Sequence, residues 1–97
     1  MYTLPTEKDR TTYPDLLYYL KDVSDWQTLG AHILPGNPAG PIEIIYSTYK
    51  GDVRECKKAL FMEYLKNGDR SWNTVITGLI KIDNKNLAKE IKQKLGL

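Results

Sequence analysis

Cysteine and histidine are nearly absent from this chain, and their scarcity excludes several kinds of chemistry. Cys56 and His32 are the only members of their types among 97 residues, so no internal disulfide can form. Neither has a second Cys or His at the spacing that a zinc site or a nucleophile–base pair requires. The residues therefore predict no metal site, no cofactor and no catalytic dyad, and Cys56 is interpreted as a small buried hydrophobe.

Long apolar runs are also missing, as is a charged and then apolar leader after Met1. No stretch is long enough to span a bilayer, and the glycines between Pro35 and Pro41 lack the Lys-Ser/Thr ending of a phosphate-binding loop. Carboxylates are plentiful, but no pair is arranged for acid–base work. We therefore expect a non-catalytic protein in a reducing, cytoplasmic setting.

The net charge of +2 conceals an uneven distribution of charge along the chain. Residues 1–49 hold three basic and six acidic side chains, giving −3, whereas residues 50–97 hold eleven basic and six acidic ones, giving +5. A domain that is acidic at one end and basic at the other can attract copies of itself head to tail. The alternative is that these charges cover a solvated surface and bind nothing.

The stretch 24–34 carries the helical signal around which we expect the domain to close. Ser24 and Asp25 are residue types that accept hydrogen bonds from the free N–H groups of a first helical turn. Trp26, Leu29 and Ile33 follow at spacings of three and four, which places them on one helical face. We expect this helix, over 25–33, to be a wedge in a small core.

Apolar spacing predicts a compact all-α domain of six short helices. Residues 1–12 are polar and aperiodic and are expected to form a flexible lead-in to one domain over residues 13–97. The other expected helices cover 14–21, 41–49, 53–66, 72–81 and 85–95. In the helices expected at 14–21, 72–81 and 85–95, the residues expected to face inward are Leu16, Leu17, Leu20, Trp72, Val75, Ile76, Leu79, Leu87, Ala88, Ile91 and Leu95.

The third helix is the least regular of the six. Residues 34–41 hold three prolines and two glycines, a density that predicts a kinked connector with the helix starting at Pro41. Ile42, Ile45 and Tyr49 then share one face, while Ile44 and Tyr46 fall off it. A strand over 42–49 is the alternative, because its β-branched and aromatic content also suits one.

The fourth helix is the longest, with Asp52 expected as its N-terminal cap. Its inward stripe is Val53, Cys56, Leu60 and Tyr64, widened by Phe61 and Leu65, and its outward stripe is Arg54, Lys58, Met62 and Lys66. Gly68 is expected in the left-handed conformation that ends many helices. Ser71 is expected to cap the fifth helix, and Gly78 within it suggests close approach of a neighbouring helix.

Four motifs in register resemble the death domain family. They are DWQTLGAHI at 25–33, Asp52-x3-Cys56-x3-Leu60-Phe61-x2-Tyr64-Leu65, Ser71-Trp72-x2-Val75-Ile76-x2-Leu79, and Leu87-Ala88-x2-Ile91. The resemblance covers about residues 15–91. The chain departs from the family at Tyr64, where Trp is usual, and at the Pro-rich connector, which replaces a short Leu-Gly-Leu type turn.

The resemblance implies a six-helix antiparallel bundle with a death-domain-like Greek key and no catalytic site. It also implies binding to other death domains, in oligomers or filaments that scaffold signalling in cell death or innate immunity. Family members use three contact types. Projected onto this chain, the first draws on Arg54, Lys58 and Met62. The second joins Glu63, Lys66, Asp69 and Arg70 to Lys81, Asp83 and Lys85. The third joins Glu43 and Tyr46 to Asp22, Asp25, Lys50 and Asp52.

A small basic helical nucleic-acid-binding domain is the alternative function. It is motivated by the +5 charge of residues 50–97 and by a stripe of Lys85, Lys89 and Lys92 on the last helix. That helix offers no Arg and no aromatic between its lysines, and a pI of 8.6 is mild for such a domain. Assembly with kindred domains is therefore the favoured prediction.

Overall fold

The computed structural model describes residues 9–97, and over this range the protein is all-helical. Its six helices are α1 (Tyr13–Tyr19), α2 (Trp26–Ile33), α3 (Ala39–Thr48), α4 (Val53–Asn67), α5 (Trp72–Lys81) and α6 (Lys85–Leu95). No strand forms within the described range, although one isolated antiparallel bridge joins Arg10 to Ser71. Residues 42–48 belong to a helix, so the strand alternative for this stretch is wrong.

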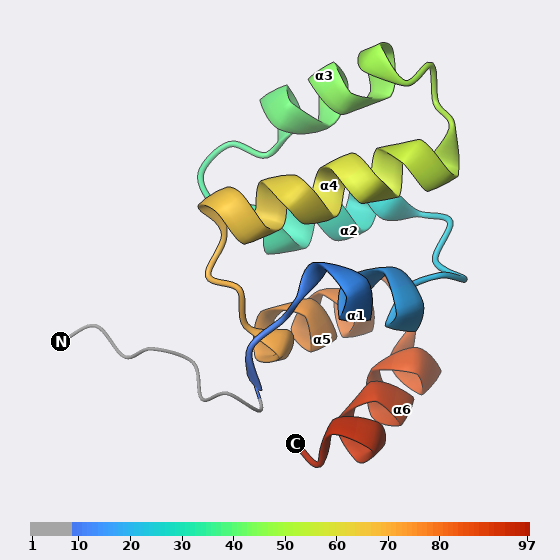
Figure 1. Cartoon of the computed structure of the whole chain (residues 1–97), viewed down its shortest axis with the longest axis vertical. Helices are drawn as coiled ribbons and strands as arrows, with labels where there is room; N and C mark the ends of the chain where they lie inside the picture. Colours follow the sequence, from blue (N-terminus) through green and yellow to red (C-terminus); the bar gives the residue numbers. More distant parts are fainter. Residues whose placement is uncertain (1–8) are drawn as a thin grey trace, which may run out of the picture.

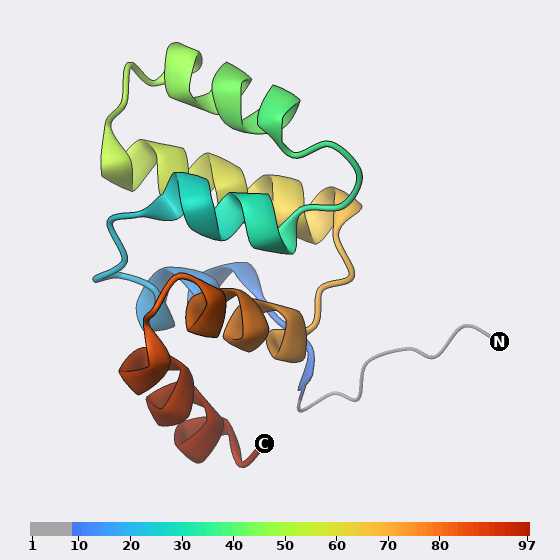
Figure 2. The same cartoon turned by 180° about the vertical axis from the view of Figure 1, so that it is seen from behind.

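The helices form two pairs with a further helix at each end (Figure 1). Helices α1 and α4 lie side by side on one face, and α2 and α5 lie on the other, as Figure 2 shows from behind. Helix α3 packs on α2 and α4 at one end, and α6 packs on α5 at the other. The connections after α1, α3 and α5 therefore meet at one edge, and those after α2 and α4 meet at the opposite edge.

The core confirms most of the inward faces that apolar spacing predicted. Both indoles are buried, with Trp26 3% exposed and Trp72 1% exposed. The Tyr19 ring meets Trp72 edge to face, with 5.6 Å between ring centroids. Leu29 and Leu60 are among the fully buried core residues. The wedge role expected for α2 agrees with its contacts, because α2 packs against α3, α4 and α5 at once.

Three helices begin with a side-chain cap. Asp52 accepts a hydrogen bond from the Glu55 N–H at 3.0 Å, and Ser71 accepts one from the Asn73 N–H at 3.0 Å, as predicted. Thr12 accepts one from the Asp15 N–H at 3.4 Å. The cap predicted for α2 is wrong, because Asp25 makes no such bond and instead accepts from the Thr28 hydroxyl at 2.9 Å.

Helix α3 starts at Ala39, two residues before the predicted Pro41. A proline within the first turn removes an N–H that has no partner in the helix, so Pro41 does not prevent the turn from forming. The Asn37 side chain accepts a hydrogen bond from the Ala39 N–H at 3.4 Å and so marks this start. The irregular connector is therefore shorter than the composition of 34–41 suggested.

Two aromatic or branched residues predicted to face inward lie at the surface. Tyr49 and Val53 are each 40% exposed. They flank the turn that joins α3 to α4, which lies at the edge of the bundle (Figure 1). Helical periodicity gives the correct face, but it does not say where a helix runs past its neighbours.

The lead-in predicted over 1–12 lies mostly outside the described residues. Within 9–12 the chain is held against the domain, because Thr11 is 2% exposed and both its N–H and its hydroxyl donate to the Arg70 carbonyl at 2.9 Å. None of the helices described here combines the length and the apolar content that crossing a bilayer demands.

Replacing Gly78 by alanine is expected to destabilise the protein by separating α2 from α5. A Cβ there would lie 2.9 Å from Ile33 Cγ2 and 3.2 Å from Leu29 Cδ1. Ile33 branches at Cβ and is buried, so its methyl cannot swing aside. After the gain in helix propensity, we expect a net loss of about 1 kcal/mol, seen as a Tm lower by about 4–8 °C.

Gly40→Ala is the matched control for this substitution. Gly40 also lies within a helix, but nothing would stand within 4 Å of a Cβ there. We expect its Tm to stay the same or rise. A rise in Tm for Gly78→Ala as well would contradict the close approach of α2 and α5.

Candidate interaction surface

The sixteen residues predicted to bind partners all reach the surface of the protein. Fourteen are exposed, and the remaining two, Lys58 and Glu63, are half-buried. Accessibility is necessary for a contact, but it is shared by many other side chains. The geometry around each group decides which residues are free to meet a partner and which already serve the fold.

The second contact type has its two halves at opposite edges of the molecule. Lys66 and Arg70 lie at the end of α4 and in the loop that follows, whereas Asp83 and Lys85 lie at the corner between α5 and α6 (Figure 1). Two different surfaces on opposite sides can join successive copies head to tail. This placement could not be obtained from the sequence without the order in which the helices pack.

The third contact type has its two halves next to each other. The loops that carry Asp22 and Lys50 reach the same edge of the bundle (Figures 1 and 2). Tyr46, assigned to the other half, is 50% exposed, and its ring lies about 3.2 Å from where a Cβ on Gly51 would be. The α3 surface and the loop before α4 therefore form one continuous patch.

The first contact type is divided between two hollows on either side of α4. Arg54 and Lys58 line a groove of about 440 Å³ between α1 and α4, together with Lys21 and Phe61. Met62 lines a different and more open hollow of about 530 Å³, whose other residues are Tyr49, Ala59, Glu63, Leu65 and Lys66. The first hollow is basic and the second is mostly apolar, so the three residues do not form one surface.

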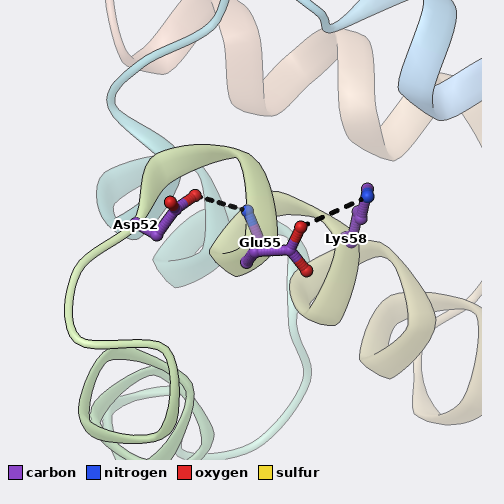
Figure 3. Close-up of polar contacts among 3 residues, drawn as sticks. All are labelled: Asp52, Glu55 and Lys58. Carbon is purple, nitrogen blue, oxygen red and sulfur yellow. Dashed lines mark hydrogen bonds and ion pairs between the residues drawn. The ribbon is translucent and has the colours of Figure 1, made fainter.

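Figure 3 shows that two predicted contact residues are already engaged at the start of α4. The Asp52 carboxylate caps the helix by accepting the Glu55 N–H, and the Glu55 carboxylate pairs with Lys58 Nζ at 3.3 Å. A cap contributes about 1 kcal/mol to stability, whereas an exposed ion pair contributes little. Asp52 therefore serves the fold, and Lys58 can exchange its partner at small cost.

The loop between α4 and α5 is built around the Asp69 carboxylate. One oxygen accepts from the Tyr64 hydroxyl at 2.8 Å and from the Ser71 N–H at 3.0 Å, and the other accepts from the Thr74 hydroxyl at 2.5 Å. Burial raises the pKa of Asp69, but these donors outweigh it and lower the pKa overall. Burial, with the nearby Asp69 charge, raises the pKa of Tyr64, which keeps its proton. Asp69 is thus a structural centre of the predicted contact.

The backbone conformation at Gly68 differs from the prediction, and the left-handed residue lies two positions later. Gly68 is extended (φ −87°, ψ −177°), so the left-handed cap predicted there is wrong. Arg70 takes the left-handed conformation instead, with φ 63°. Glycine is still needed at 68, because a Cβ would lie 2.5 Å from the ring of Tyr64, which its hydrogen bonds hold in place.

Lys57 is a buried cation that the sequence did not lead us to expect. It is 8% exposed, and its Nζ donates to the carbonyls of Leu20 at 3.1 Å and Lys21 at 2.7 Å, which end α1. Burial lowers the pKa of Lys57, while the charge of Asp22 opposes this change. The sequence held one signal for this burial, because Lys57 lies four residues before Phe61 and so falls on the widened inward stripe of α4.

Cys56 and His32 lie apart from any arrangement that suggests chemistry. Cys56 is fully buried, and burial raises the pKa of its thiol, which keeps the thiol protonated and unreactive. His32 is exposed in the last turn of α2. Within residues 9–97, no three His, Cys, Asp or Glu side chains gather closely enough to hold a metal ion.

The lysine stripe on α6 lies on the surface of that helix. Lys85, Lys89 and Lys92 are exposed, as the nucleic-acid alternative requires. Lys94 on the same helix pairs with Glu90 at 3.2 Å. Comparisons of the chain with protein-family models, with curated proteins and with solved structures give no match.

Asp69→Asn is expected to reduce the acid sensitivity of the fold. Because the pKa of Asp69 is lowered by folding, its charge stabilises the native state above the unfolded pKa, and this contribution disappears as the pH falls through the native pKa. Urea unfolding of both proteins at pH 7 and pH 3 measures the effect. The variant should be less stable at pH 7 and lose less on acidification. An equal loss in both proteins would contradict the network.

Lys57→Met is expected to lower the free energy of unfolding by about 1–3 kcal/mol. The substitution keeps most of the length and the unbranched apolar stem of the side chain but leaves two carbonyls at the end of α1 without their donor. Lys58→Met is the matched control, because its exposed ion pair contributes at most about 1 kcal/mol. Chemical denaturation compares them, and equal losses would mean that Lys57 does not stabilise the end of α1.

Proposed function

We propose that this chain is a non-catalytic assembly module of the death domain type, with the family's Greek key order of six helices. It binds copies of itself or kindred domains and builds oligomers that scaffold intracellular signalling in cell death or innate immunity. The observation that carries this proposal is the placement of two charged surfaces at opposite edges of an all-helical domain.

Charge complementarity supports a head-to-tail contact between these edges. The edge at the end of α4 presents the anion Glu63 with the cations Lys66 and Arg70, and the corner between α5 and α6 presents the anion Asp83 between the cations Lys81 and Lys85. Each surface therefore offers charges of both signs to the other. Each exposed ion pair contributes less than about 1 kcal/mol, so a single contact is weak. Repetition over many copies supplies the avidity that one contact lacks.

This kind of contact is sensitive to salt. Exposed charges are screened over about 10 Å at 0.1 M ionic strength, so assembly should grow as the salt concentration falls. The distribution of mass measured by light scattering across a salt series detects this. A protein that stays monomeric at every salt concentration and at high protein concentration would exclude self-assembly.

Two charge-reversal variants are expected to fail alone and to assemble when mixed. Arg70→Glu and Asp83→Lys each place like charges at both surfaces of every contact between identical copies. In an equimolar mixture, the carboxylate introduced at position 70 of one variant meets the ammonium introduced at position 83 of the other. The unchanged Arg70 and Asp83 meet in the next contact, so alternating copies can join. Sedimentation of each variant and of the mixture at low salt measures assembly.

The controls separate the contact from the fold. Circular dichroism should show full helicity in both variants. Asp83→Lys places a lysine in a left-handed position, as Lys50 already is, and Arg70→Glu changes an exposed side chain while the carbonyl that Thr11 contacts stays the same. Lys89→Glu combined with Lys92→Glu changes the charge of the exposed α6 surface, outside the proposed contact. Loss of assembly in this control, or no recovery in the mixture, would contradict the proposed surfaces.

A further inference from the structure

The residues just before α1 form a second support for the loop between α4 and α5. The Thr11 N–H and hydroxyl both donate to the Arg70 carbonyl at 2.9 Å. The Asp9 carboxylate accepts from the Ser71 hydroxyl at 2.8 Å and from the Asn73 N–H at 3.0 Å. Four hydrogen bonds therefore link two segments that lie about sixty residues apart in the sequence.

These hydrogen bonds lie at the part of the loop whose backbone conformation is least favourable. Arg70 has φ 63°, and the left-handed conformation is unfavourable for a residue with a side chain. Its carbonyl direction is fixed by Thr11, which is itself 2% exposed and so shielded from water. Asp69 fixes the next residue by accepting the Ser71 N–H. The segment 9–11 thus holds the Arg70 carbonyl through Thr11, and the Asp69 carboxylate holds the N–H of the residue that follows Arg70.

The same segment completes the N-terminal cap of α5. The Asn73 N–H is shared between the Ser71 hydroxyl and the Asp9 carboxylate, and the Ser71 hydroxyl donates in turn to Asp9. A carboxylate is favourable at this position, because the N-terminal end of a helix carries partial positive charge. Removing Asp9 would weaken both the cap and the loop that leads into it.

We propose that Asp9 and Thr11 are positioning residues for the partner-binding surface at the end of α4. They hold the loop in the backbone conformation that points Arg70 outward, and they couple that surface to the N-terminal end of the domain. The effect on assembly rests on the proposed function. The effect on the loop itself does not, and it can be measured in the monomer.

Amide hydrogen exchange in the monomer, kept apart by high salt, tests the effect on the loop. In Asp9→Ala and Thr11→Val, we expect the Thr11, Ser71 and Asn73 amides to exchange about tenfold faster, because charge-assisted or shielded hydrogen bonds are lost. Thr11→Ser keeps the hydroxyl and should restore slow exchange. Asp15→Ala is the matched control, because Asp15 is a similarly half-buried carboxylate at the start of another helix. It should leave these amides unchanged.

Assembly at low salt then tests the positioning role. Asp9→Ala and Thr11→Val should reduce the assembled fraction at least several-fold, and Asp15→Ala should not, even where its Tm falls by the same amount. Unchanged exchange at the three amides would overturn the support itself. Faster exchange with undiminished assembly would overturn the positioning role. If the wild-type protein never assembles, the proposed function fails while the exchange result still decides whether the segment holds the loop.

Discussion

The start of α5 imposes the constraint on which much of this structure depends. Trp72 must be buried there, 1% exposed, at a point where the free N–H groups of a first helical turn also need acceptors. The chain meets both demands by gathering polar groups around the helix end. Ser71 and Asp9 accept from the Asn73 N–H, and Asp69 accepts from Ser71. The indole can therefore pack against Tyr19 without leaving the backbone beside it unsatisfied.

Close packing of α2 is the second constraint, and small residues make it possible. A Cβ at Gly78 on α5 would lie 2.9 Å from Ile33 Cγ2 on α2. Likewise, a Cβ at Gly30 on α2 would lie 2.9 Å from Leu60 Cδ1 on α4. Glycine at both sites lets one short helix lie against two neighbours. Because α2 contacts α3 as well, the placement of the outermost helix depends on the same close approach.

Local signals in the sequence were sufficient to predict the six helices, but they did not predict all of the helix ends or the arrangement of the candidate surface. Periodicity identified the buried residues of α5 and α6, and the caps at Asp52 and Ser71 followed from residue type and position. The exposed Tyr49, the extended Gly68 and the buried Lys57 could not be found in this way. Tyr49 depends on where a neighbouring helix ends, Gly68 depends on the Tyr64 ring, and Lys57 depends on carbonyls about 36 residues earlier in the chain. Each requires the tertiary arrangement.

A surface that binds through exposed charges gains most from a backbone that is already ordered. Such an ion pair contributes roughly 0.2–1 kcal/mol, whereas ordering one flexible residue costs about 1–2 kcal/mol of conformational entropy. A loop that became ordered only on binding would therefore cancel the contact that it makes. In this protein the loop after α4 is already ordered within the domain itself, through Tyr64 and Asp69 on one side and Thr11 on the other. Folding thus compensates for the unfavourable left-handed conformation of Arg70. Under the proposed function, the full interaction of its guanidinium is then left for the partner.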